Sequence, residues 1–464
     1  MSDTPPGDTL RQLVVDKETA PQRVRCVPLC FQSEKFGRTG FRVFKEGRAV
    51  VKKKWSLGNV VVVAAMFSLA LCAEGAGTYS VVRNFSSKLG DIPYGGLLMD
   101  QAGNLYGANS AGGTGNWGTI FELSPNGKGG WTYNEIYDCG KANDCSVPVG
   151  SLVMDQAGDL YGVTYFGNLF ELMPSGSGVW TGRVIHTFGG GSDGSAPSPV
   201  VLDAAGNLYG VNGTGGQDNL GYVFELTSSI GGWSLVHLQD FTGSDGAETT
   251  NTAGGQVAGL VWDSVGNLYG TTGLGGSGSK CQGGCGLIFE LKNESGKWRE
   301  TVLHNFNDSD GANPDAALTI DAAGNLYGTT TSGGTKGLGV VFKLSESSGK
   351  WTGKVLHNFT GTHLDGAYPN TTLIMDSAGN LYGATESGGA DLQSCQVMND
   401  FGCGTAFELS PNGAQWKMAI LHAFTGRKDG GFPGGVVRDA NGNLFGAAQA
   451  GGANAGGVLF KIVP

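Results

Sequence analysis

Residues Asp376-Ser-Ala-Gly-Asn-Leu-Tyr-Gly-Ala-Thr385 decide the fold, because near copies of this stretch recur along the chain. Its core, Gly-Asn-Leu-Tyr-Gly, occurs seven times with single departures at Asp159 and Phe445. The copies begin at Gly103, Gly158, Gly206, Gly266, Gly324, Gly379 and Gly442. A period of about 55 residues indicates a repeat array, because a unit of that size usually buries its apolar face against neighbouring units.

Each repeat contains four candidate strands, which we name a, b, c and d in chain order. In the sixth repeat they cover residues 372–376, 380–385, 404–410 and 416–424. All are short, rich in branched and aromatic residues, and bounded by Gly, Pro, Asn or Ser, which is typical of β-strands. The a-to-b and c-to-d links are short, whereas the d-to-a link is longer and carries Asp-Gly. We therefore expect an antiparallel meander in each repeat and a crossover from one sheet to the next.

Seven such meanders with no helical segment between them predict an all-β, seven-bladed β-propeller of four-stranded antiparallel blades. The two ends of the repeat region agree with a closed ring. Residues 79–85 match a strand d, and the last residues, 460–464, match a strand c. We predict that the N-terminal strand d joins the C-terminal strands a to c, which removes the exposed sheet edge. A solenoid would not require such matched, incomplete ends.

The composition is that of a turn-rich folded chain, with 83 glycines, 15% charged residues and 40% hydrophobic residues. The charge is uneven. Residues 78–464 hold 18 Lys and Arg against 33 Asp and Glu, a formal net charge of -15. Binding of a nucleic acid needs clustered basic side chains, so we expect no nucleic-acid partner.

The N-terminal segment has a different character from the repeats. Residues 1–46 lack periodicity, and we expect them to be disordered or to lie upstream of the true start. Residues 47–77 combine basic side chains with an apolar run, 60–73, of about 14 residues and a small-residue exit, which predicts a signal peptide. The alternatives are an uncleaved anchor using residues 55–76 and a lipoprotein acylated at Cys72. With 78–464 as the propeller, the predicted location is secreted, periplasmic or cell-surface.

Six cysteines in the repeat region form three local pairs: Cys139 with Cys145, Cys281 with Cys285, and Cys395 with Cys403. Local pairs in an exported chain predict disulfides. The spacings do not form a four-ligand metal set, and no histidine lies within the three loops. We expect neither a bound metal nor a cofactor.

Two repeated polar positions favour structural roles. The aspartates that close strand a could bind calcium, but a carboxylate that caps its own turn explains every copy without a metal. They are Asp100, Asp155, Asp203, Asp263, Asp321, Asp376 and Asp439. Strand d, read with a period of two, places Trp351, Val355, His357 and Phe359 on one face. His186, His304 and His422 occupy the position of His357, and we expect these histidines to pack rather than to catalyse.

Binding residues are expected where the repeats differ. The crossover and b-to-c loops share one end of the propeller and vary most over blades four to six, and loops on a rigid scaffold commonly carry function. The alternative is a set of surface loops without a ligand. We assign no catalytic residue, since nucleophile and phosphate-binding motifs are absent from the sequence. The candidate binding residues are Asp245, Glu248, Lys280, Asp310, Asp365, Tyr368, Asp391 and Phe401.

The repeat resembles the bacterial tandem repeats called GloVer. The fifth unit carries the pattern as Asp310-Gly-Ala-Asn-Pro314, residues 321–330 and Gly339-Val-Val-Phe-Lys-Leu344. Proteins of this kind are exported and often carry a C-terminal anchor, which we do not expect here because the sequence ends within a strand c. The resemblance implies no known reaction.

We therefore expect an exported, monomeric binding module for a glycan, a peptide or a cell-surface partner. The alternatives are a lyase or glycosidase acting on extracellular polysaccharide and a structural envelope protein. Two carboxylates about 5–9 Å apart at the channel mouth would favour hydrolysis. An aromatic-lined face would favour binding.

Overall fold

The computed structural model describes backbone and side chains for most of residues 77–464. The unit Gly75–Pro464 is compact, and residues Met1–Glu74 form a separate unit. Before residue 77 only the backbones of β1 (Thr9–Val14), β2 (Arg25–Cys30), β3 (Val43–Lys45) and β4 (Arg48–Val51) are described. The predictions for residues 1–46 and 47–77 therefore fall mostly outside the described residues, and they stay predictions. The gaps after residue 77 are 87, 89, 141–143, 177, 248–258, 363–364, 390–394 and 396–401.

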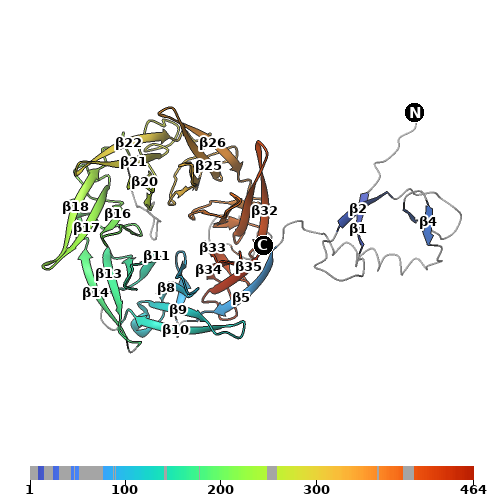
Figure 1. Cartoon of the computed structure of the whole chain (residues 1–464), viewed down its shortest axis with the longest axis horizontal. Coiled ribbons are helices and arrows are strands. Elements are labelled where there is room, and N and C mark those ends of the chain that lie inside the picture. The colour runs from blue at the N-terminus through green and yellow to red at the C-terminus, as the bar shows by residue number, and fades with distance from the viewer. Residues whose placement is uncertain are drawn as a thin grey trace. The chain divides into compact units, whose positions relative to one another are not determined.

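Seven antiparallel sheets follow one another around a ring, which confirms the predicted seven-bladed propeller (Figure 1). We number the blades by their strand a. The a strands are β7 (Leu98–Met99), β11 (Pro148–Met154), β15 (Val201–Leu202), β19 (Val261–Trp262), β23 (Thr319–Ile320), β28 (Ile374–Met375) and β33 (Gly431–Arg438). The b strands are β8 (Leu105–Ala111), β12 (Leu160–Thr164), β16 (Leu208–Asn212), β20 (Leu268–Thr272), β24 (Leu326–Thr330), β29 (Leu381–Thr385) and β34 (Leu444–Ala450).

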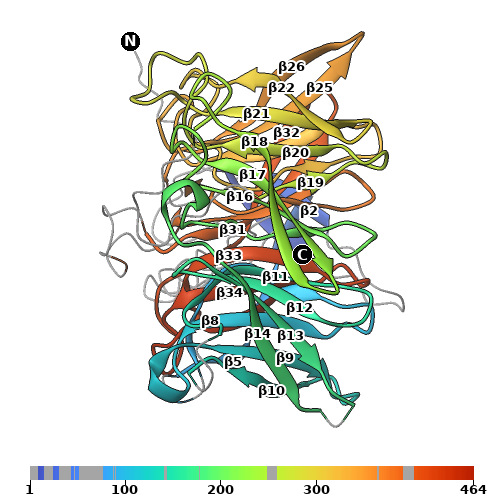
Figure 2. The same cartoon turned by 90° about the vertical axis from the view of Figure 1, so that its left-hand side faces the viewer.

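The outer half of each blade is a hairpin of strands c and d, seen from the side in Figure 2. The c strands are β9 (Thr119–Pro125), β13 (Asn168–Pro174), β17 (Tyr222–Ser229), β21 (Leu287–Glu294), β25 (Val340–Ser347), β31 (Thr405–Asn412) and β35 (Val458–Val463). The d strands are β10 (Trp131–Asp138), β14 (Trp180–Thr187), β18 (Gly232–Asp240), β22 (Lys297–Asn305), β26 (Lys350–Asn358), β32 (Gln415–Ala423) and, for blade seven, β5 (Thr78–Asn84).

A few short elements decorate the loops. Strand β6 (Asp91–Pro93) adds to blade one, and β27 (Gly366–Ala367) pairs with β30 (Ser387–Gly388) beside blade six. Helical structure in the described residues is limited to the 3-10 turns η1 (Thr114–Asn116) and η2 (Gly191–Asp193). The repeats are thus built almost entirely from strands and turns.

The ring closes as predicted, with the first strand of the propeller in the last blade. Strand β5 pairs with β35, so that Val81 lies opposite Phe460 and Tyr79 opposite Ile462. In Figure 1 the blue β5 lies along the red β35. Tyr79 also stacks on His422 of blade six, with 3.8 Å between the ring centroids. Closure therefore joins residues far apart in sequence through both main-chain and aromatic contacts.

A phenylalanine of strand c lies directly over the glycine of strand b in every blade. A Cβ added at Gly328 would stand 2.6 Å from Cζ of Phe342, and the seven equivalent distances run from 2.4 to 2.8 Å. No real Cβ is tolerated so close to a ring that is itself packed on both sides. The last Gly of the Leu-Tyr-Gly motif is therefore required by packing. The rings are Phe121, Phe170, Phe224, Phe289, Phe342, Phe407 and Phe460.

The a-to-b turns confirm the predicted capping role of the repeated aspartates. In blade six, Oδ1 of Asp376 accepts hydrogen bonds from the amides of Ala378 and Asn380, both at 2.9 Å. The hydroxyl of Tyr382 donates to Oδ2 of the same carboxylate at 3.1 Å. The amide four residues after the aspartate makes the same bond in all seven turns, at 2.8 to 2.9 Å.

Strand d does not follow the predicted uninterrupted period of two. Val355 lies opposite Phe342 and His357 opposite Val341, so one extra residue, Leu356, forms a bulge. Trp351 and Val355 pack in the cluster shared with blade four, whereas Phe359 packs in the cluster shared with blade six. The prediction that Val355 and His357 share one face is therefore wrong, because a bulge reverses the alternation.

Substitution of Gly328 by Ala tests the packing of phenylalanine on glycine. We expect the unfolding midpoint to fall by the equivalent of about 1–3 kcal/mol, because the new methyl group overlaps the ring of Phe342. Thermal denaturation measures it. The matched control is Gly189→Ala, where an added Cβ meets no atom within 4 Å. Equal midpoints for the two variants would contradict the proposed role of the glycine.

Candidate functional site

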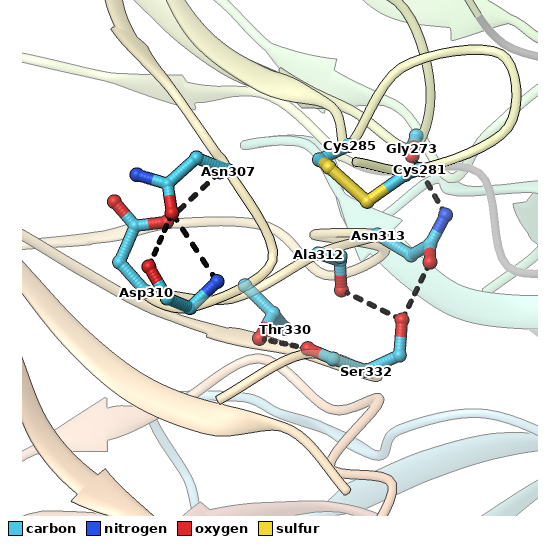
Figure 3. The surroundings of a disulfide bond; sticks show 10 residues. Gly273, Cys281, Cys285, Asn307, Asp310, Ala312, Asn313, Thr330 and Ser332 are labelled. Carbon is cyan, nitrogen blue, oxygen red and sulfur yellow. Dashed lines mark hydrogen bonds between the residues drawn. A yellow bond between two sulfur atoms is a disulfide. The ribbon is translucent and has the colours of Figure 1, made fainter. Parts of the chain in front are cut away.

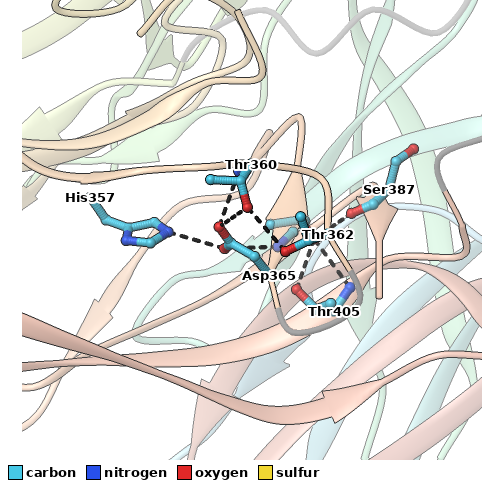
Figure 4. A network of polar contacts seen from close by, with 8 residues as sticks. His357, Thr360, Thr362, Asp365, Ser387 and Thr405 are labelled. Carbon is cyan, nitrogen blue, oxygen red and sulfur yellow. Dashed lines mark hydrogen bonds and ion pairs between the residues drawn. The ribbon is translucent and has the colours of Figure 1, made fainter. Parts of the chain in front are cut away.

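Three of the predicted binding residues, Asp245, Asp310 and Asp365, occupy the same place in three successive crossover loops. Oδ2 of Asp365 accepts hydrogen bonds from the amide and the hydroxyl of Thr360, at 3.0 and 2.8 Å, and Oδ1 lies 3.0 Å from Nε2 of His357 (Figure 4). Asp245 accepts from the amide of Thr242 at 2.7 Å. Each carboxylate thus holds its own loop closed.

Asp310 shows how these contacts act on the carboxyl group. Burial acts to raise its pKa, but hydrogen bonds from His304 and from the amide of Asn307 outweigh burial, so the pKa of Asp310 lies below its usual value. Nε2 of His304 lies 3.1 Å from Oδ2. The Asn307 amide donates to Oδ1 at 2.9 Å (Figure 3). The repeated histidines of strand d therefore serve the loops as packed hydrogen-bond partners, and His304 also packs edge-on against Phe306.

The other predicted residues are dispersed. Lys280 is exposed beside Cys281, and Tyr368 is half-buried with a φ of 55°. Glu248, Asp391 and Phe401 lie outside the described residues. None of the five described candidates lines the axial cavity described below. A binding role for these eight residues stays a prediction.

All three predicted disulfides are formed, Cys139 with Cys145, Cys281 with Cys285 and Cys395 with Cys403. The second belongs to a cluster that contains Phe306 and Ala312 of the following crossover. Beside it, Nδ2 of Asn313 donates to the carbonyl of Gly273 at 2.9 Å (Figure 3). The disulfide loop of blade four is thereby tied to blade five.

A cavity of about 730 Å³ follows the propeller axis and is lined by the inner strands of all seven blades. Small residues bring these strands close together. A Cβ at Gly95 would stand 2.5 Å from the carbonyl carbon of Gly150, and one at Gly434 would stand 2.6 Å from the carbonyl oxygen of Gly95. The remaining wall is mainly valine, leucine, proline and alanine. The glycines therefore let the blades pack around the axis while the cavity stays open.

Asp315 is the only carboxylate among the described residues that line this cavity. Thr331 donates its hydroxyl to Oδ2 at 3.0 Å. Burial raises the pKa of Asp315 to about 7, although the hydrogen bond from Thr331 acts to lower it. The group can therefore change its charge near neutral pH.

A second carboxyl group and a tyrosine lie at the same end of the inner strands. Nδ2 of Asn370 donates to Oε2 of Glu386 at 3.3 Å, and burial raises the pKa of Glu386. Burial, followed by the charge of Glu386, raises the pKa of Tyr94. Glu386 belongs to blade six and Tyr94 to blade one, so their interaction extends past blade seven. At the position of Tyr94, blade seven has Gly434, which has no side chain. Tyr94 lines the cavity together with Asp315.

Three exposed aromatic side chains, Trp117, Tyr165 and Phe166, form what we call the aromatic mouth. They are 40%, 47% and 54% exposed. The ring centroid of Phe166 is 6.2 Å from that of Trp117 and 5.5 Å from that of Tyr165. Tyr165 and Phe166 line the cavity. The amide of Tyr165 donates to the carbonyl of Val147, whose own amide donates to the carbonyl of Trp117, so one main-chain ladder supports the mouth.

Sequence reasoning missed this site because it looked for long loops. Tyr165 and Phe166 form the shortest b-to-c loop of the array, and Asp315 changes the repeat by a single residue. The signal was present in the alignment of the repeats: the residue after the proline that ends the crossover loop is Tyr94, Val149, Asp315 or Asn370 in different blades. A position that varies on an otherwise small and apolar strand is a candidate for function.

The profile of the Gloeobacter/Verrucomicrobia repeat matches residues 62–252 and 256–464. The chain belongs to this family. No curated protein matches the sequence of this Gloeobacter/Verrucomicrobia repeat protein. In the described part of the chain, no helix has the length and apolar character needed to cross a bilayer. Nor do three or more metal-ligating side chains come together among the described residues.

Solved structures similar to this Gloeobacter/Verrucomicrobia repeat protein are distant in sequence. A gluconolactonase from Xanthomonas campestris has 12% identity and a TM-score of 0.39, over 69% of this chain and 90% of that chain. PorZ, a surface component of the type-IX secretion system of Porphyromonas gingivalis, has 15% identity and a TM-score of 0.49, over 82% of this chain and 48% of that chain. A protein from Lactobacillus plantarum has 15% identity and a TM-score of 0.46, over 74% and 86%. We draw no function from these similarities.

Substitution of Asp310 by Asn tests whether the crossover aspartates hold the loops of this repeat protein. A depressed pKa means that the ionised carboxylate stabilises the fold above the unfolded pKa of about 4, and that this stability is lost as the pH falls through the folded pKa. We expect the variant to be less stable by about 1–2 kcal/mol at pH 7, and this difference to shrink only as the pH falls below ~4 towards the depressed pKa of Asp310. Thermal denaturation against pH measures it, with Asp218→Asn, an exposed aspartate, as control. A pH-independent difference would contradict the assignment.

Substitution of Asp315 by Asn should change the pH dependence of stability in the opposite direction to Asp310→Asn. Because its folded pKa of about 7 lies above the unfolded value, the native state binds the proton more tightly and the parent loses stability as the pH rises from about 4 to 7. The asparagine variant lacks this loss. We expect its melting temperature, relative to the parent, to increase from pH 5 to pH 8. An unchanged difference across this range would show that Asp315 titrates normally.

Proposed function

We propose that this chain is an exported binding propeller whose ligand site is the aromatic mouth with the axial cavity. The observation that carries the proposal is Phe166, 54% exposed, grouped with Trp117 and Tyr165 at the edge of a cavity of about 730 Å³. Leaving large apolar rings in contact with water is unfavourable, so a group of such exposed rings marks a surface that another molecule covers.

The surroundings of the mouth support binding. A rigid ring of blades holds the loops, and loops on a rigid scaffold commonly carry function. The cavity volume falls within the range of about 300–1,000 Å³ that small-molecule sites occupy. Tyrosine and tryptophan offer a large contact area at low cost in side-chain entropy. A glycan, a peptide or a surface partner with one projecting group would fit such a mouth.

Export is supported by the three disulfides, because such bonds persist in oxidising compartments. The acidic propeller, with its formal net charge of -15 for residues 78–464, argues against a nucleic-acid ligand. The proposed location is therefore the cell surface, the periplasm or the medium. We expect the binding partner in the same compartment.

A second candidate function is hydrolysis or elimination on an extracellular polysaccharide. Its support is the raised pKa of both Asp315 and Glu386 at one end of the inner strands, since a carboxyl group with a raised pKa can act as a general acid. Product release from a panel of polysaccharides, abolished in Asp315→Asn and Glu386→Gln, would favour this candidate. Capture without product release favours binding alone.

Substitution of Phe166 by Ala tests the proposed site. The full-length chain is applied to an array of glycans and peptides, and affinity for each captured probe is then measured by surface plasmon resonance. We expect the variant to lose about tenfold or more in affinity, because an aromatic side chain at the centre of a site is a typical hot spot. The matched control is Val265→Ala, an 81% exposed apolar side chain on an a-to-b turn. Equal affinity of the Phe166 variant and the parent for every captured probe would refute the site.

A further inference from the structure

The charge inside the axial cavity has no basic partner in the described lining. Asp315 is the only carboxylate there, and among the described lining residues there is no Lys, Arg or His. Oδ2 of Asp315 accepts a hydrogen bond from the hydroxyl of Thr331 at 3.0 Å. A buried ionised carboxylate is costly without a paired cation. A ligand that carries a positive charge would therefore supply what the cavity lacks.

The wall around Asp315 suits an alkyl chain. Val149, Val163, Val200, Leu260 and Val436 line the cavity, and its polar side chains are mainly hydroxyl groups. Long aliphatic stems of amine-bearing chains pack on apolar walls while the charged head makes its polar contact elsewhere. A neutral glycan buried here would leave many of its hydroxyl groups without partners, which is unfavourable.

The approach to the cavity favours a cation as well. Tyr94, Tyr165 and Phe166 line the same cavity, and the face of an aromatic ring attracts an ammonium group. The formal net charge of residues 78–464 is -15, so the long-range field of the propeller attracts positively charged ligands.

We propose that the axial cavity binds an unbranched alkylammonium group, with Asp315 as its counter-ion and the aromatic mouth around its entrance. This inference rests on the proposed function of the cavity as the ligand site and names the ligand chemistry. The group could belong to a lysine side chain of a partner polypeptide or to a free polyamine. Both sources present the same ammonium head on an aliphatic stem.

Binding of an ammonium group needs the ionised form of Asp315, so affinity depends on pH. The titratable groups around the cavity are Tyr94 and Tyr165 on the wall and Glu386 on blade six, which interacts with Tyr94. Burial, followed by the charge of Glu386, raises the pKa of Tyr94 above its ordinary value of about 10, so Tyr94 stays neutral at pH 6–8. With the pKa of Asp315 near 7 in the free protein, affinity rises by up to about tenfold from pH 6 to pH 8.

Isothermal titration calorimetry on the full-length chain tests the proposal with 1,6-diaminohexane and, as a neutral probe of the same length, 1,6-hexanediol. We expect the parent to bind the diamine more tightly than the diol, and more tightly at pH 8 than at pH 6. Asp315→Asn should weaken diamine binding by about tenfold or more, because it removes a charge-assisted hydrogen bond. Val265→Ala should leave it unchanged. An equal affinity of parent and Asp315→Asn for the diamine, or equal binding of diol and diamine, would overturn the proposal.

A lysine tripeptide with blocked ends, and the same peptide with its lysine acetylated, distinguish the two sources. Tighter binding of the lysine peptide than of the diamine points to a partner polypeptide, and the reverse points to a free polyamine. Acetylation should abolish peptide binding. If the array yields neutral ligands that depend on Phe166 while the diamine does not bind, the mouth is a binding site and the alkylammonium assignment is wrong. If no captured probe depends on Phe166, the proposed function itself fails.

Discussion

The contact between the phenylalanine of strand c and the glycine of strand b is the constraint on which each blade depends. At 2.4 to 2.8 Å from the place of an added Cβ, the ring leaves no room for any other residue in the last position of Leu-Tyr-Gly. The neighbouring tyrosine is fixed by its bond to the turn aspartate, as Tyr382 is to Asp376. Uniformity of this motif therefore reflects packing and turn geometry. The seven copies mark the scaffold.

Most of the fold could be predicted from the sequence, because its determinants are local and repeated. The turn aspartates, the short strands and the local cysteine pairs each lie within one repeat, and the matched ends predicted the pairing of β5 with β35. The bulge at Leu356 could not be predicted, since an alternating pattern of apolar residues does not show where one residue is inserted. That bulge turns His357 towards the following blade and its loop.

The candidate site was harder to predict than the fold, because it joins single residues from distant repeats. Tyr94 and Glu386 interact from blades one and six, and Asp315 of blade five lines the same cavity as Tyr94. Each of these three groups belongs to a different repeat, so the pattern within a single repeat does not bring them together. The crossover aspartates attracted interest because they recur, yet the contacts of Asp365 with His357 and Thr360 belong to its own loop. In this propeller the repeated polar residues build loops, and a residue that departs from the repeat, Asp315, changes the chemistry of the axis.

The central claim is that the ligand binds on the propeller axis and not on the long loops of blades four to six. A crystal structure of the full-length chain soaked with 1,6-diaminohexane tests it most directly. The account predicts density for the chain of the diamine in the axial cavity, with one nitrogen within hydrogen-bond distance of the Asp315 carboxylate. A ligand bound instead beside Lys280 or Asp245, with the axial cavity free of ligand, would contradict it.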